Sequence, residues 1–243
     1  MCIVDFDMVV ARLDDIRSVS KSVLGRDEID FVSVEPPTAP FDELYFRKTI
    51  SWLFVLLRET GPFFKFSEKL LRAKPDRYER WRSLKDTVEC ARTVHEHNMR
   101  RSNPGDQRKV RSYQIWIDSF VGSPLNWEEC CRALLKQAIA VLGDIAREWT
   151  ERSADDGDRA DIRENYEQDK RSHWDAHEFD PFVMSAAIEF QLDGFDSAAF
   201  RKDSGRVERW RKLAAMFESR EAAEAAIDRA IRAEFRAVFG DPV

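Results

Sequence analysis

The chain has 243 residues, of which 43% are hydrophobic, so it is long enough to bury a core and too apolar for a disordered protein. Its formal net charge of −6 excludes a general attraction to nucleic acid, so any nucleic-acid site must be a local basic patch. Four cysteines without a C-x-x-C spacing do not form a disulfide framework, and we expect reduced thiols in a cytoplasmic protein.

The first half of the chain reads as a series of helices. Residues 5–24 have helical apolar spacing, and Gly25 is suited to end that helix. Prolines make residues 29–40 a connector, with room for a short extended segment at 29–32. A strong helix follows, capped by Asp42 and ended by Gly61. Its run ISWLFVLL is apolar around most of the circumference, which predicts a central helix, and is too short to span a bilayer.

The remaining elements are also predicted as helices. A short amphipathic piece at 63–74 precedes Pro75, which opens a helix over 76–100 that the SNPGD segment breaks. Helices then follow over 108–122 and 127–153, the second introduced by Asn126. The polar segment 153–180 is a linker or an exposed helix, and the last helical patterns cover 181–192, 206–217 and 220–239.

These elements predict an all-α protein built on an antiparallel helical bundle. We expect the parts to be an N-terminal helix with a proline-rich connector at 1–40, the bundle at 41–152, a polar linker at 153–180 and a C-terminal helical region at 181–243. The sequence does not decide whether the first 40 residues dock on the bundle or on a partner.

One segment, ECARTVHEHNMRRSNPGDQRKVRS, combines Arg92, His95 and His97 with a basic run. Histidine titrates near neutrality and can act as acid or base, whereas arginine is permanently charged and binds phosphate through a planar fork. RNA cleavage without a metal needs such a base, an acid and a cation. The candidate RNA-binding residues are Asn98, Arg100, Arg101, Arg108, Lys109 and Arg111. The alternative to a catalytic site is that these residues are polar positions at a solvated helix end.

The segment resembles the Arg-x-x-x-x-His motif of the HEPN-domain ribonucleases, with Arg92 and His97 at the fixed positions, and the helical order over about 41–152 is similar to that family. The resemblance implies a homodimer with a composite site, metal-independent RNA cleavage and no cofactor. It also implies a toxin or effector role in bacterial defence, restrained by a regulatory partner. The family often has Asn, Asp or His after the motif arginine, where this chain has Thr93.

Helical geometry leaves the choice of imidazole open. At 100° per residue Arg92 and His95 share a face, while His97 lies about 140° from Arg92 unless the helix loosens near SNPG. We prefer His97 on the resemblance and keep His95 as a supporting candidate. Glu96 would raise a histidine pKa if it lay close.

Other residue patterns have simpler interpretations. His173 and His177, four apart, would bind a metal only if they met the other histidine pair, and we expect no metal site. Aromatic residues that could stack on bases are expected in the core instead: Trp81, Tyr113, Trp116 and Trp127. The alternative function, from a different class, is a non-catalytic helical interaction or regulatory subunit.

Overall fold

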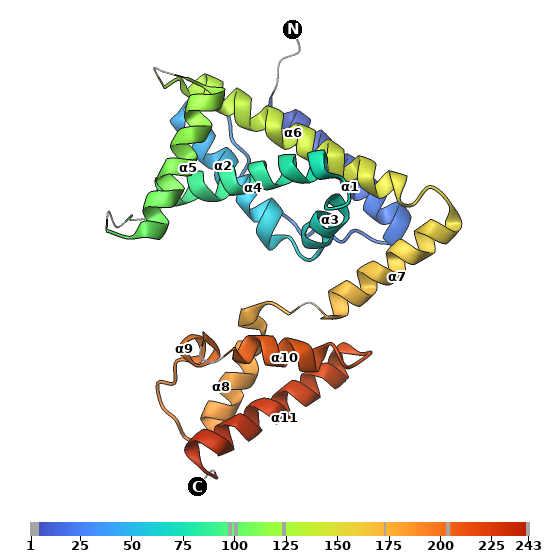
Figure 1. Cartoon of the computed structure of the whole chain (residues 1–243), viewed down its shortest axis with the longest axis vertical. Coiled ribbons are helices and arrows are strands. Elements are labelled where there is room, and N and C mark those ends of the chain that lie inside the picture. Colours follow the sequence, from blue (N-terminus) through green and yellow to red (C-terminus); the bar gives the residue numbers. More distant parts are fainter. Residues whose placement is uncertain are drawn as a thin grey trace. The chain divides into compact units, whose positions relative to one another are not determined.

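The computed structural model describes residues 5–96, 99, 102–122, 125–172, 174–202 and 205–241. Within these ranges the chain is all-helical and contains no β-strand, which confirms the predicted fold class at the level of secondary structure. The chain divides into two compact units, Met1–Arg163 and Glu164–Val243 (Figure 1). No helix in the described part is long and apolar enough to cross a membrane.

Among its described residues, the first unit contains six complete helices and the start of a seventh. Their bounds are α1 Phe6–Leu24, α2 Glu43–Glu59, α3 Phe63–Leu71, α4 Pro75–Glu96, α5 Pro104–Phe120, α6 Trp127–Glu151 and α7 Asp156–Ser172. In the part of the second unit that the structure describes, the end of α7 precedes a short 3-10 helix and four α-helices. These are η1 Ala176–Phe179, α8 Asp180–Glu189, α9 Ser197–Lys202, α10 Arg206–Ala214 and α11 Arg220–Phe239.

Local sequence signals determine several of the helix ends. The Asp42 carboxylate accepts a hydrogen bond from the Tyr45 backbone amide at 2.9 Å, which confirms the predicted cap of α2. Gly25 ends α1 with a φ of 80°, a left-handed conformation that glycine adopts without steric cost. Asn103 and Asn126 accept backbone hydrogen bonds at the starts of α5 and α6. The predicted helix bounds are therefore accurate mainly where a capping residue was recognised.

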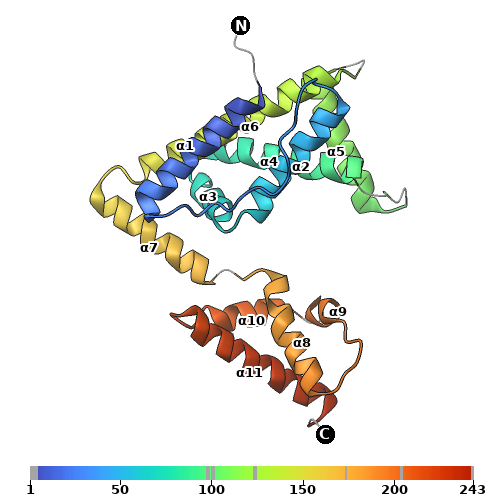
Figure 2. The same ribbon diagram turned by 180° about the vertical axis from the view of Figure 1, so that it is seen from behind.

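The helix α2 is central to the first unit, as its apolar run predicted. It packs against α3, α4 and α6, and its Phe46, Leu53 and Leu56 are fully buried. The helix α1 lies along α6, which can be followed in Figure 1 and, from behind, in Figure 2. The N-terminal helix therefore docks on the bundle of its own chain, a choice that the sequence left open.

The segment predicted as a linker or exposed helix, 153–180, is helical from Asp156 to Ser172. It is not fully exposed, because Ile162 and Tyr166 are buried. The boundary between the two units falls inside this helix, at Arg163 and Glu164. Of the aromatic residues assigned to the core, Trp81, Tyr113 and Trp116 are buried, while Trp127 is half-buried.

Candidate functional site

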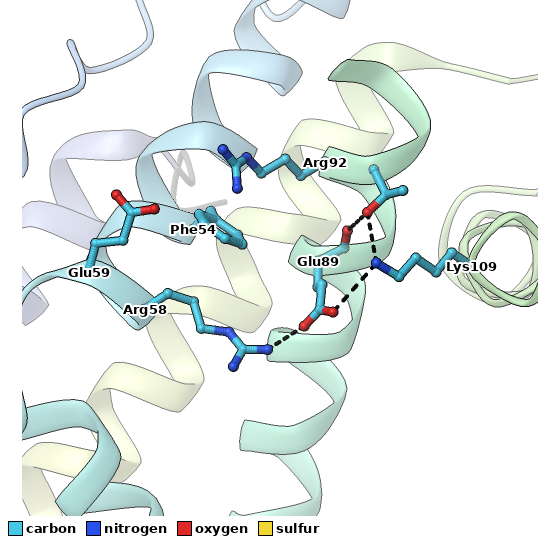
Figure 3. Close-up of a pocket in the computed structure, with 7 residues that line it drawn as sticks. Phe54, Arg58, Glu59, Glu89, Arg92 and Lys109 are labelled. Carbon is cyan, nitrogen blue, oxygen red and sulfur yellow. Dashed lines mark hydrogen bonds and ion pairs between the residues drawn. The ribbon is translucent and has the colours of Figure 1, made fainter. Parts of the chain in front are cut away.

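An open pocket of about 400 Å³ lies where α2, α4 and α5 meet (Figure 3). Helix α2 contributes Phe54, Arg58 and Glu59. Helix α4 contributes Glu89, Arg92 and Thr93, and α5 contributes Lys109. The wall therefore carries three cationic and two acidic side chains around one aromatic ring.

Arg92, the arginine of the candidate motif, lies in this pocket above Phe54, as Figure 3 shows. The centre of its guanidinium is 3.8 Å from the ring centroid, which is a cation–π contact. Its Nε donates to the Glu96 carboxylate at 3.1 Å, and the Ser51 hydroxyl donates to the same carboxylate. The side chain is 32% exposed. The cation is held in a fixed orientation and is still accessible to a ligand.

Glu89 binds two cations from two other helices. Its Oε2 accepts a hydrogen bond from Arg58, and its Oε1 lies 3.6 Å from the Lys109 Nζ. Lys109 also donates to the Thr93 hydroxyl at 3.2 Å, and that hydroxyl donates to the Glu89 backbone carbonyl at 2.9 Å. The four side chains form one network (Figure 3), which ties α2 and α5 to the middle of α4.

His95 has different surroundings from Arg92. Its Nε2 lies 2.9 Å from the Tyr113 hydroxyl oxygen, and its ring packs edge-on against Phe46, Tyr113 and Trp127. None of these residues lines the pocket that holds Arg92. Two residues predicted to share a helix face therefore contact different neighbours, and the structure does not bring His95 to the motif arginine.

Burial lowers the pKa of His95 below its usual value, and the positive charge of Arg47 lowers it further. The carboxylates of Glu43 and Glu96 act in the opposite direction but have smaller effects. Glu96 therefore raises the pKa of His95, as expected, but burial and Arg47 outweigh it and the net shift is downward. The imidazole is half-buried and its protonated form is disfavoured. These surroundings suit a structural hydrogen bond better than acid–base exchange with solvent.

The remaining predicted site residues do not all lie at the pocket. Lys109 lines the pocket, whereas Arg108 and Arg111 on the same helix are exposed and do not line it. Four predicted residues lie outside the described residues: His97, Asn98, Arg100 and Arg101. His97 directly follows Glu96, the last residue of α4 and the ion-pair partner of Arg92.

Metal and thiol chemistry have few candidates here. Within the described ranges no group of three or more His, Cys, Asp or Glu side chains could hold a metal ion. His177 lies in η1, and His173 is outside the described residues. Burial raises the pKa of the Cys131 thiol to about 12 and that of Cys130 to about 11, so both are inert at neutral pH.

Four pocket residues were not predicted from sequence: Phe54, Arg58, Glu59 and Glu89. Arg58 and Glu59 are the last residues of α2, where charged side chains are common on an exposed helix end. Glu89 precedes the motif arginine by less than one helical turn, and that spacing was the available signal. Comparison with known proteins adds no assignment: no family model, no curated protein and no solved structure matches the chain significantly.

Proposed function

We propose that the chain is a metal-independent RNA endonuclease of the HEPN type, in which Arg92 and His97 act at a site completed by a second copy. The observation that carries this proposal is the position of Arg92 in an open pocket beside Lys109. The residue that would complete the motif, His97, follows the last residue of α4. The motif cation thus lines a solvent-accessible hollow, and the candidate imidazole follows it closely in the sequence.

The chemistry assigns each residue a role. His97 takes the proton of the ribose 2′-hydroxyl or protonates the leaving oxygen, and Arg92 balances the charge of the phosphorane. Cleavage leaves a 2′,3′-cyclic phosphate and needs no metal. One chain offers one motif histidine, whereas the reaction needs a base and an acid. A two-fold axis that brings two motifs together supplies both.

The biological role follows the same resemblance. We propose a toxin or effector of a bacterial defence system, held inactive by a regulatory protein until it is needed. An RNase restrained in this way protects the RNA of its own cell. The protein then cleaves RNA only when the regulatory protein is absent or has released it.

The test is cleavage of total RNA and tRNA in EDTA. Wild type is compared with Arg92→Ala and His97→Ala, with His95→Ala as a third variant. Arg82→Ala is the matched control, because Arg82 is on the same helix and its 3.0 Å ion pair with Glu79 is exposed. We expect chelator-resistant cleavage that is lost in the Arg92 and His97 variants and retained in the control.

A second candidate, a non-catalytic helical interaction subunit, is favoured by a different observation. Arg92 is already engaged by Phe54 and by Glu96, which is also how a purely structural arginine is held. This candidate predicts that Arg92→Ala lowers stability and leaves RNA intact. If wild type cleaves no RNA even when its regulatory partner and activating signal are supplied, the nuclease proposal fails. The interaction subunit is then the function that is retained.

A further inference from the structure

The Glu89 carboxylate occupies a position that matches what a phosphate group would occupy. Its two oxygens each face a different cation, Arg58 on one side and Lys109 on the other. A phosphate presents oxygens in a similar fork, and guanidinium and ammonium groups are its usual protein ligands. The two cations come from α2 and α5, which face each other across α4 (Figure 3).

We infer that Arg58 and Lys109 form a binding site for an RNA backbone phosphate, and that Glu89 fills this site as an internal competitor. RNA binding displaces the carboxylate from both cations. The phosphate then takes its place next to Arg92. That the ligand is RNA rests on the proposed function, whereas the anion site rests only on the geometry of the pocket.

The exposure of the three side chains makes the displacement feasible. Arg58 is 38% exposed, Glu89 is 35% exposed and Lys109 is 37% exposed. Ion pairs at this level of exposure are screened by water and contribute little net stability. A competing anion therefore has no deeply buried salt bridge to break.

The charge of the pocket changes when Glu89 leaves. Its wall has three cations against the two carboxylates of Glu59 and Glu89, so Glu89 cancels much of the positive field. With Glu89 turned away, Glu59 is the carboxylate left in the pocket wall, and Glu96 still pairs with Arg92. The formal charge of the whole chain is −6, so this displacement gives an acidic protein a local basic site without any added residue.

Thr93 has a part in this arrangement that its place after the motif arginine did not suggest. Its hydroxyl accepts a hydrogen bond from Lys109 at 3.2 Å and donates to the backbone of Glu89 at 2.9 Å. The contact with Thr93 does not involve the Glu89 carboxylate. Lys109 is therefore still held toward the pocket after that carboxylate moves, so Thr93 is a positioning residue for the phosphate ligand.

The experiment measures binding without cleavage. A fluorescein-labelled 2′-O-methyl RNA, which lacks the attacking hydroxyl, is titrated in EDTA and followed by anisotropy at several salt concentrations. The variants are Glu89→Gln, Arg58→Gln and Lys109→Gln, and Glu79→Gln is the control. Glu79 lies on α4 like Glu89, and its pair with Arg82 is at the surface. Glutamine keeps an acceptor for Arg58, so the fold is retained, which circular dichroism checks.

We expect Glu89→Gln to bind roughly three- to tenfold more tightly than wild type, and Glu79→Gln to match wild type. Arg58→Gln and Lys109→Gln should bind more weakly and lower the salt slope by about one each. In the Glu89→Gln background, Arg58→Gln should remove the gain. Equal affinities for Glu89→Gln and Glu79→Gln overturn the inference.

Comparing the binding and cleavage results separates this inference from the nuclease proposal. If wild type cleaves no RNA even with its partner and trigger supplied, but Glu89→Gln still gains affinity, the cleavage proposal fails and the phosphate site stands. If cleavage occurs and the affinities do not change, the phosphate site fails alone. Inorganic phosphate is added as a competitor. If inorganic phosphate displaces the RNA at a concentration equal to that of the RNA's own phosphate groups, the assignment to an RNA backbone is overturned.

Discussion

The Nε2 of His95 lies 2.9 Å from the hydroxyl oxygen of Tyr113, and this contact joins the last turn of α4 to the middle of α5. Tyr113 is buried, and His95 is half-buried against aromatic rings. We expect Tyr113→Phe to lower the free energy of unfolding by about 1 kcal/mol, because one polar partner of a half-buried imidazole is lost. Urea denaturation followed by circular dichroism measures the change. A variant as stable as wild type would show that water replaces the tyrosine.

The same imidazole predicts a pH dependence. Its folded pKa lies below the usual 6.5, so between the two values the unfolded chain holds more protons at His95 than the folded chain. The free energy of unfolding should therefore rise with pH in that window and fall as the solution is acidified below about 6.5. His95→Gln should flatten this part of the curve. An unchanged curve in the variant would assign the pH dependence to other groups.

The stacking of Arg92 on Phe54 predicts that lysine cannot replace this arginine. Lysine keeps the charge but lacks the planar guanidinium that lies 3.8 Å from the ring and reaches Glu96 at the same time. In the EDTA cleavage assay we expect Arg92→Lys to lose roughly 100-fold in rate, close to Arg92→Ala. Glu96→Gln is the companion variant and should keep most of the activity. Full activity in Arg92→Lys would mean that charge alone is needed.

Glu148 predicts the largest stability effect among the charged residues of the first unit. It is 1% exposed, and its carboxylate accepts hydrogen bonds from Arg77 at 2.7 Å and from Arg152 at 2.6 Å. Glu148→Ala removes this buried partner from Arg152, which is 39% exposed, and from Arg77, which keeps Glu151, and should cost about 1–3 kcal/mol. Glu128→Ala, on the exposed start of the same helix, is the control and should change stability much less. Thermal melts of both variants make the comparison.

The second unit should unfold without the first. Phe235 is fully buried, and its ring centroid lies 4.9 Å from that of Phe200 and 5.6 Å from that of Phe190. Phe235→Ala should cost about 3–5 kcal/mol within the unit Glu164–Val243. Hydrogen exchange read by mass spectrometry should then speed up in α8 and α11 and stay unchanged in α2 and α4. A uniform increase across the chain would mean that the two units fold as one.

The sequence predicts most of the helices because their ends carry capping signals and their faces carry apolar periodicity. Asp42 and Gly25 illustrate the first, and the apolar run of α2 illustrates the second. The helix α9, Ser197–Lys202, was missed because six residues are too few to show a helical period.

The candidate site was predictable only in part, because a sequence pattern shows which residues share a helix face but not which neighbour that face contacts. Arg92 and His95 differ by about 60° around an ideal helix. That difference is enough to put one against Phe54 and the other against Tyr113. The pairing of Arg58 with Glu89 depends on how α2 and α4 are rotated about their axes, which no local signal encodes.

The helix that carries Arg92 is held near both of its ends. In its first turn Arg77 binds Glu148 and Glu151 of α6, and in its last turn His95 binds Tyr113 of α5. Such a helix cannot tilt at one end without breaking contacts at the other, so it moves as a whole or not at all. Adjustment to an incoming ligand must then come from side-chain rotation in the pocket, which is fast and leaves the backbone register of α4 intact.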